Sequence, residues 1–321
     1  MNKLVVRSIP FVLFVAFLAI SPFVLGDGAL HLANEMFIII VIASMWNFLA
    51  GYAGLVSLGH QMYFGAGGYV LFMFANATGM SPYFGIPMAF AFGACAAAII
   101  APVLFRLRDA YFAIASWVIA EVVSIAVQKT DALGGISGVS LSDISVLDFT
   151  RFESQMFLIG GAMVLLTVLG FLWLLRSKPG LAFMCVRDNE LAARTIGVDV
   201  WRNRFLAYVL SAAGCAAAGA LSCLSGLTVQ PGNALSADWT AIMTFVVVVG
   251  GIGTLEGPIL GTLIYFALRQ LLTVVLPLSG TWYMVAMGGV AVATMLYSPA
   301  GLWPILRDKL GGNWLAIRRA M

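Results

Sequence analysis

The chain has 321 residues, of which 62% are hydrophobic and only 10% are charged. Soluble domains carry about 25% charged and about 45–50% apolar residues, so this composition excludes an ordinary soluble protein and predicts a polytopic membrane protein. The formal net charge is only +3 and the basic residues lie in a few short segments, which excludes nucleic acid as an expected partner.

Ten apolar stretches are candidates for crossing a bilayer, which takes about 20 residues. Lys3 and Arg7 precede the first stretch as in a signal peptide, but more hydrophobic stretches follow, so we expect an uncleaved first helix. The eighth stretch has only about a dozen residues, which would suit a tilted, half-buried or re-entrant segment. The expected spans are roughly 9–25, 33–50, 60–77, 86–105, 110–128, 155–175, 205–228, 239–250, 257–276 and 282–298.

The charges in the loops predict how these spans are oriented, because cytoplasmic loops are enriched in lysine and arginine. By this rule the basic segments 3–7, 106–108 and 307–319 lie inside, and the acidic segment 129–154 lies outside. Ten spans with both termini cytoplasmic satisfy every loop. The sequence therefore predicts an all-α transmembrane bundle that forms a single domain over residues 1–321.

Two glycine-rich breaks, Gly51–His60 and Gly250–Pro258, interrupt the apolar pattern on the cytoplasmic side. Each follows an out-to-in span and precedes an in-to-out span, and Ser57-Leu58 resembles Thr254-Leu255, which suggests an internal repeat of about five helices. Non-helical backbone at membrane depth is tolerated where it is buried or lines a cavity, so the breaks are candidates for a translocation path. Tight turns that merely need glycine are the alternative. The candidate residues are Gly54, Ser57, Gly59, His60, Gly251 and Gly253.

Few ionisable side chains lie within the expected spans, and at that depth such a group must face a cavity or a partner. Glu121 in the fifth span and Arg269 in the ninth are therefore further candidates for the path. A structural ion pair or a side chain that snorkels to the surface is the alternative for both. His60 is a lone histidine beside a break, and we favour a hydrogen-bonded structural role over a proton relay.

The segment 176–204 is polar and rich in arginine, and the loop charges place it in the cytoplasm. Within it we expect a short helix over residues 191–196, capped by Asp188 or Asn189 and ended by Gly197. A helix of about two turns is not stable alone in water. It must therefore rest on the membrane surface, on the rest of the chain or on a partner protein.

Other motifs are informative mainly by their absence. The sequence contains no G-x-x-x-x-G-K-[ST] phosphate loop and no H-E-x-x-H or C-x-x-C pattern, so we expect neither a metal site nor an ATP-hydrolysing site in this chain. The four cysteines are interpreted as small apolar side chains. Small residues at every fourth position of the seventh expected span, from Ser211 to Cys223, predict a face that packs closely against another helix.

Several blocks of the sequence resemble the permease subunit of branched-chain amino acid ABC importers of the LivM type. Gly51–His60 is similar to the G-Y-x-G-x-x-S-L-G-H/Q pattern of that family, and Gly250–Pro258 is similar to G-G-x-G-T-x-x-G-P. Leu107–Ile114 resembles L-R-G-x-Y-F-A-I, with Asp109 where glycine is usual. The matching blocks run in order from about residue 51 to residue 302, over most of the chain.

The resemblance implies a permease subunit in the bacterial inner membrane that carries branched-chain or other hydrophobic amino acids. It implies four kinds of neighbour: a second related permease, two ATP-binding-cassette ATPase subunits, a periplasmic substrate-binding protein and the lipid bilayer. ATP would be used by the ATPases, with no cofactor in this chain. The short helix in 176–204 resembles the "EAA" coupling motif that docks on the ATPase, with Leu191 at the glutamate position. The implied coupling residues are Asp188, Asn189, Glu190, Leu191, Ala192, Ala193 and Gly197.

Three alternatives stay open at this point. Urea and short-chain amide permeases share the same architecture, so the substrate is not determined by the matching blocks. An ion-coupled secondary transporter would need Glu121, Glu35 or His60 to carry the coupled charge. A membrane enzyme is disfavoured, because the expected spans contain no cluster of histidine, aspartate or cysteine.

Overall fold

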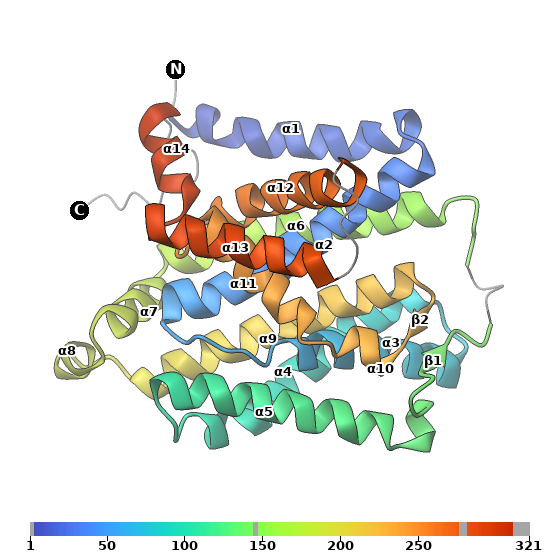
Figure 1. Cartoon of the computed structure of the whole chain (residues 1–321), viewed down its shortest axis with the longest axis horizontal. Helices are drawn as coiled ribbons and strands as arrows, with labels where there is room; N and C mark the ends of the chain where they lie inside the picture. The colour runs from blue at the N-terminus through green and yellow to red at the C-terminus, as the bar shows by residue number, and fades with distance from the viewer. Residues whose placement is uncertain (1–2, 144–146, 276–280, 311–321) are drawn as a thin grey trace.

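The computed structural model describes residues 3–143, 147–275 and 281–310, and in these ranges the chain is helical apart from one two-stranded sheet. Most of the long helices run side by side along the longest axis of the molecule (Figure 1). The polar helices α7 and α8 lie at one end of this bundle, and strands β1 and β2 lie at the opposite end (Figure 1). The prediction of an all-α bundle is confirmed.

The elements follow one another with few long connections. The helices are α1 (Lys3–Val24), α2 (Asp27–Asn47), α3 (Gln61–Thr78), α4 (Gly85–Leu104), α5 (Asp109–Gln128), α6 (Phe152–Arg176), α7 (Lys178–Asp188), α8 (Glu190–Thr195), α9 (Val200–Ser225), α10 (Pro231–Ala234), α11 (Asp238–Gly250), α12 (Gly257–Gln270), α13 (Thr281–Tyr297) and α14 (Leu302–Leu310). Short π-helical turns are η1 (Phe48–Tyr52) and η5 (Leu271–Val275), and short 3-10 turns are η2 (Pro82–Phe84) and η3 (Asp131–Leu133). Strand β1 (Val139–Ser140) pairs antiparallel with β2 (Thr228–Val229).

Each of the ten predicted spans contains a helix, but not every helix is long enough to cross a membrane. Among the described residues, six helical segments are long and apolar enough. Helices α11 and α12 have 13 and 14 residues. Helix α11 is as short as the sequence indicated for the eighth span, and it reaches spanning length only together with α10, in the segment Pro231–Gly250. Arg318 and Arg319, which contribute to the predicted orientation of the C-terminus, lie outside the described residues. The six segments are Asp27–Tyr52, Pro82–Leu104, Asp109–Gln128, Phe152–Arg176, Val200–Ser225 and Pro231–Gly250.

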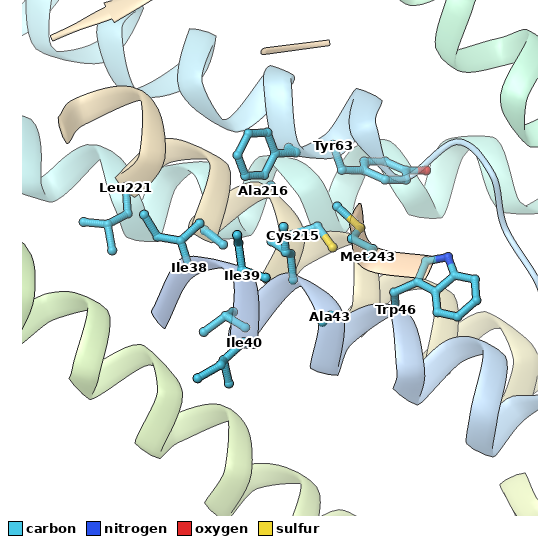
Figure 2. Close-up of a cluster of buried hydrophobic side chains, with 14 of the residues drawn as sticks. Ile38, Ile39, Ile40, Ala43, Trp46, Tyr63, Cys215, Ala216, Leu221 and Met243 are labelled. Atoms are coloured by element: carbon cyan, nitrogen blue, oxygen red, sulfur yellow. The ribbon is translucent and has the colours of Figure 1, made fainter. Parts of the chain in front are cut away.

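Helices α2 and α9 form the centre of the bundle. In the most apolar stretch of each helix, 78% of α2 and 72% of α9 is buried inside the molecule. The corresponding share is 22% for both α4 and α5, which therefore present a broad outer face. Figure 2 shows side chains of α2 such as Ile39 and Trp46 gathered with Tyr63 of α3, Cys215 of α9 and Met243 of α11. These contacts hold the helices on either side of the first glycine-rich break, and the helix before the second break, in one core.

The small residues of α9 pack inside this chain. A Cβ atom added at Gly219 would overlap the carbonyl oxygen of Phe64 on α3, and one added at Gly93 of α4 would lie 2.6 Å from the Cβ atom of Ala216. Backbones approach this closely only where side chains are absent or minimal. The predicted close-packing face of the seventh span is thus confirmed, and its neighbours are α3 and α4.

Candidate functional site

The polar segment 176–204 folds as two helices, α7 and α8, where the sequence predicted one. Ser177 followed by Pro179 in the first turn of α7 is the start signal that the sequence analysis missed. Of the two predicted caps of α8, the structure selects Asn189, whose Oδ1 accepts a hydrogen bond from the backbone N–H of Ala192 at 3.0 Å. Gly197 follows α8 with φ +83°, the left-handed conformation that favours glycine, as predicted.

A small apolar cluster of Val186, Ala193 and Val200 anchors α8 to α7 and α9. Ala193 is only 1% exposed, so it packs inside the segment and does not present itself to a partner. Of the two alanines among the implied coupling residues, only Ala192 is exposed. The prominent exposed side chains are instead Leu191 and Ile196, at 75% and 69%. Leu191 and Ile196 therefore give this short helix an exposed apolar patch.

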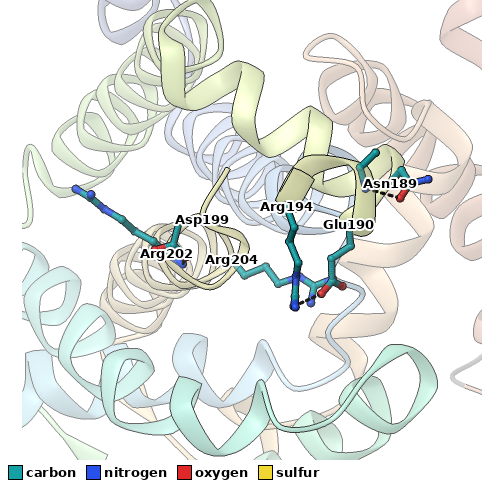
Figure 3. A network of polar contacts seen from close by, with 7 residues as sticks. Asn189, Glu190, Arg194, Asp199, Arg202 and Arg204 are labelled. Carbon is teal, nitrogen blue, oxygen red and sulfur yellow. Dashed lines mark hydrogen bonds and ion pairs between the residues drawn. The ribbon is translucent and has the colours of Figure 1, made fainter. Parts of the chain in front are cut away.

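Glu190 connects the short helix to the long helix that follows. Its Oε1 lies 2.6 Å from Nη2 of Arg194, and its Oε2 lies 2.9 Å from Nη2 of Arg204 on α9 (Figure 3). Arg194 is thus engaged within the chain, in a contact with Glu190. The side chain of Arg202 points away from this group in Figure 3, and it has no polar partner within the described part of the chain.

The two glycine-rich breaks lie against each other. Asn47, at the end of α2, donates from Nδ2 to the carbonyl oxygen of Thr254 at 2.7 Å and accepts at Oδ1 from the backbone N–H of Gly253 at 2.8 Å. A Cβ atom at Gly51 would lie 2.5 Å from the backbone nitrogen of Gly253, so only glycine permits this approach. Asn47 is not among the residues predicted from the sequence, although an amide at the end of an apolar span is an available signal.

Arg187, near the end of α7, joins the polar segment to these breaks. Its Nη1 donates to the carbonyl oxygen of Gly51 at 2.7 Å. Its side chain also pairs with Asp188, with Nη2 2.8 Å from Oδ1. The carbonyl of Gly51 lies in the π-helical turn η1, and the first break begins at Gly54, three residues later than predicted. Turns of this kind interrupt the regular helical hydrogen bonds and often occur at functional sites.

A buried hydrogen-bonded chain fixes the rest of the first break. Ser211 donates its hydroxyl to the carbonyl oxygen of Met45 at 2.7 Å, so at His60 it must act as acceptor, 2.8 Å from Nε2. His60 therefore carries its proton on Nε2 and accepts at Nδ1 from the hydroxyl of Ser57 at 2.9 Å. The ring is fully buried, and both nitrogens have partners. This geometry matches the structural interpretation of His60.

Helix α5 packs against the same break. Ser116 of α5 accepts a hydrogen bond from the backbone N–H of Leu58 at 3.0 Å, and a Cβ atom at Gly59 would overlap the carbonyl oxygen of Ser116. Gly54 lies against Arg187, with its Cβ position 3.2 Å from the Cα atom of that residue. Gly54 and Gly253 thus both lie near Arg187, whereas Gly251 lies against Ala300 and Trp303.

Two of the predicted path residues, Glu121 and Arg269, have their hydrogen-bond and ion-pair partners outside the two breaks. Glu121 of α5 accepts from Nε1 of Trp117 at 3.2 Å, and Trp117 borders an apolar cavity of about 540 Å³ between α5, α11 and α13. Arg269 of α12 forms an ion pair with Glu35, with Nη1 2.6 Å from Oε1. Glu35 is 12 residues before Asn47 on α2, or about 18 Å along the helix axis. Within the described residues, no group of three or more histidine, cysteine or acidic side chains could hold a metal ion.

Comparison with known proteins finds related membrane permeases. The profile of the family described as "Branched-chain amino acid transport system / permease component" matches residues 28–295. The chain is 26% identical over 315 residues to the high-affinity branched-chain amino acid transport system permease protein LivM of Salmonella typhimurium, covering 90% of this chain and 73% of the relative. No solved structure matches the chain.

Relatives of two kinds occur in one archaeon, Methanocaldococcus jannaschii. The chain is 27% identical over 213 residues to its probable branched-chain amino acid transport permease protein LivM, covering 62% of this chain and 61% of the relative. It is also 24% identical over 271 residues to the probable branched-chain amino acid transport permease protein LivH of the same organism, covering 79% of this chain and 82% of the relative. The similarity to both proteins indicates that LivM and LivH permeases share a common architecture.

Proposed function

Because this chain belongs to the family of branched-chain amino acid transport system permease components, a family of ABC importers, we propose that it carries branched-chain or other hydrophobic amino acids across the membrane. The energy would come from ATP bound and hydrolysed by separate ATPase subunits, with no cofactor in this chain. The names of the relatives support this substrate class.

The observation that carries the proposal is the contact between the polar segment and the glycine-rich breaks. Arg187 donates to the carbonyl oxygen of Gly51, and Gly51 lies against Gly253 of the second break. A displacement of α7 and α8 by an ATPase would therefore act directly on the backbone of both breaks. A densely packed interior does not deform continuously but shifts between discrete arrangements, so a displacement of α7 and α8 would move whole segments.

The docking surface that we propose consists of the exposed side of α8, with Leu191, Ala192 and Ile196. Asn189 and Gly197 fix the two ends of this helix, and Glu190 ties it to α9 through Arg204. Ala193 supports the helix from its buried side, through the apolar cluster. Asp188 forms the ion pair with Arg187. Because Leu191 and Ile196 are apolar, the groove of the ATPase should be apolar at its centre.

The proposed assembly has a second related permease, two ATPases and a periplasmic binding protein that delivers the substrate. The similarity of this chain to both LivM and LivH of one organism supports a pair of related permeases. The path would pass the glycine-rich breaks at Gly54, Ser57, Gly59, His60, Gly251 and Gly253, with Glu121 and Arg269 bordering other parts of it.

We further propose ten spans in a single domain over residues 1–321, with both termini in the cytoplasm. The short helices α11 and α12 meet at the second break, as α2 and α3 meet at the first, which supports the internal repeat of about five helices. The orientation places α7 and α8 inside and strands β1 and β2 outside, at opposite ends of the bundle.

Reconstitution into vesicles tests this function. Complexes with and without the ATPase subunits would be loaded with ATP and presented with the binding protein and radiolabelled leucine, urea or acetamide. We expect leucine uptake only when the ATPases and ATP are present. Uptake driven by an ion gradient without ATPases would overturn the proposal, and ATP-dependent uptake of urea or acetamide without leucine would overturn the substrate class.

A further inference from the structure

An open apolar groove of about 490 Å³ lies between α4 and α6, over α2 and α9. All four helices belong to segments that are long and apolar enough to cross a membrane, so the groove lies at membrane depth and opens to the hydrocarbon of the bilayer. Leu166 and Trp173 of α6, on its rim, are 72% and 75% exposed. None of the described residues that line it carries a charge.

Small residues leave room in this groove. A Cβ atom added at Gly170 of α6 would meet nothing within 4 Å, and α9 contributes Gly214 and Ala217. Protein interiors otherwise contain few spaces larger than a water molecule, and atoms that line an unfilled apolar space lose dispersion contacts. An apolar molecule of matching shape would therefore be stabilised in the groove.

The width of the groove suits an acyl chain and not a helix. Its border on α6 extends from Met163 to Leu174, which is about 16 Å along the helix axis. The volume spread over that length gives a mean cross-section of about 30 Å². An α-helix with its side chains is about 10–12 Å wide, with a cross-section of about 80–110 Å², so a partner's helix cannot enter. An unbranched acyl chain, which is one methylene group wide, can enter.

The end of the groove nearest α7 carries positive charge. Arg176 follows Trp173 by three residues, which places the two side chains on the same side of α6. Lys178 begins α7 two residues later, and both basic side chains are exposed. Neither side chain has a hydrogen bond or ion pair with another residue in the described ranges. Tryptophan is enriched at the membrane interface, and lysine and arginine on the cytoplasmic side attract the headgroups of anionic lipids.

We propose that this groove binds an anionic phospholipid of the cytoplasmic leaflet, with one acyl chain between α4 and α6 and the phosphate group beside Arg176 and Lys178. The chain passes Trp173 and Gly170 toward the middle of the membrane. It also contacts Met45 of α2, three residues before η1, and so supports the helix end that leads into the first break. The inference goes beyond the proposed transport and takes from it only the orientation that places α7 in the cytoplasm.

The substitution Gly170→Leu tests where the lipid binds, because it fills the groove without changing a charge. The fold should be kept, since a Cβ atom at this position meets no neighbour within 4 Å. The purified permease complex would be freed of lipid and titrated with dioleoylphosphatidylglycerol, and native mass spectrometry would count the lipids bound. We expect Gly170→Leu to weaken the binding of one lipid by about tenfold or more.

Gly289→Leu is the matched control, because a Cβ atom at Gly289 of α13 also meets nothing within 4 Å. It should bind the lipid as the wild type does. Wild-type binding in Gly170→Leu would overturn the site, and that is also the result expected if the second permease covers the groove. Equal losses in the two variants would overturn it as well.

The double variant Arg176→Gln/Lys178→Gln tests the pairing with the phosphate group. Its affinity for dioleoylphosphatidylglycerol should fall by about tenfold or more, to that for the zwitterionic dioleoylphosphatidylcholine. The control Lys129→Gln/Arg151→Gln also removes two positive charges, at exposed positions after α5 and before α6, and should bind the lipid as the wild type does.

Two outcomes would overturn the anionic ligand: a wild-type affinity in the Arg176/Lys178 variant, or equal affinities of the wild type for the two lipids. Glycerol phosphate carries the charge of the headgroup but has no acyl chain, so it should not displace the bound lipid. Displacement by an equimolar amount of glycerol phosphate would overturn the role of the groove.

Discussion

Arg187 and Gly51 are 136 residues apart in the sequence, yet Nη1 of Arg187 donates a hydrogen bond to the carbonyl oxygen of Gly51 at 2.7 Å. Arg187 belongs to the segment proposed to receive the ATPase, and Gly51 belongs to the interrupted helix end that lies against the second break. A hydrogen bond from a charged donor is stronger than one between neutral groups. This contact therefore links the two parts of the molecule that an ATP-driven importer must connect.

Because the two breaks lie so close together, even alanine at Gly51 should lower the stability of the protein. In Gly51→Ala the new methyl group would lie 2.5 Å from Oδ1 of Asn47 and from the backbone nitrogen of Gly253. We expect a loss of about 1–3 kcal/mol in the free energy of unfolding, as for other overpacked sites. Thermal unfolding of the purified protein in detergent would measure it.

Gly28→Ala is the matched control for this substitution. Gly28 lies in the first turn of α2, and a Cβ atom there would meet nothing within 4 Å. Alanine is favoured over glycine in a helix by about 1 kcal/mol, so this variant should be as stable as the wild type or slightly more so. A Gly51→Ala protein as stable as Gly28→Ala would show that the breaks do not pack as described.

The exposed apolar surface of α8 predicts how the ATPase is held. In Leu191→Asp a charge replaces a side chain that is 75% exposed, so the fold of this chain should be unaffected. We expect the ATPase to co-purify at least about tenfold less, because an unpaired charge would be buried in the interface. Ala193→Asp is a weaker test of docking, because Ala193 is buried in this chain and its substitution would disturb the segment itself.

Ile136→Asp is the control for Leu191→Asp. Ile136 is 79% exposed and lies just before β1, at the end of the bundle remote from α8. It carries the same change in size and charge, and it should leave co-purification of the ATPase unchanged. Equal loss of the ATPase in both variants, or in neither, would contradict the docking surface.

The hydrogen-bonded chain through His60 predicts a stability effect at Ser211. Ser211→Ala would leave Nε2–H of His60 and the carbonyl oxygen of Met45 without this partner in a buried site. An unsatisfied buried polar group costs about 1–3 kcal/mol, and we expect a loss of that size in thermal unfolding. Thr130→Ala, whose exposed hydroxyl bonds only within its own helix end, should be neutral. A stable Ser211→Ala protein that loses uptake would instead point to a role in transport.

Much of the fold could be predicted from hydrophobicity and helix-end signals. The ten apolar stretches, the short α8, the cap at Asn189 and the left-handed Gly197 all follow from local sequence. Helix α7 was missed because the charged residues at its two ends resemble those of a loop, although Ser177 and Pro179 mark its start.

The contacts across the molecule could not be predicted in the same way. Nothing local indicates that Arg187 reaches Gly51, that Asn47 joins the two breaks or that Arg269 pairs with Glu35. Each of these contacts depends on how separate helices pack, which a single sequence does not encode as a local pattern. The burial of Ala193 is of the same kind, because it depends on Val186 and Val200 from the neighbouring helices.

Uptake of leucine and hydrolysis of ATP, measured together in vesicles, test the central claim that Arg187 transmits motion to the breaks. Asp188→Asn removes the ion pair with Arg187 and leaves the contact with Gly51, so it should keep the wild-type ratio of uptake to hydrolysis. For Arg187→Gln we expect hydrolysis to continue while that ratio falls by about tenfold or more. A wild-type ratio in Arg187→Gln would contradict the account.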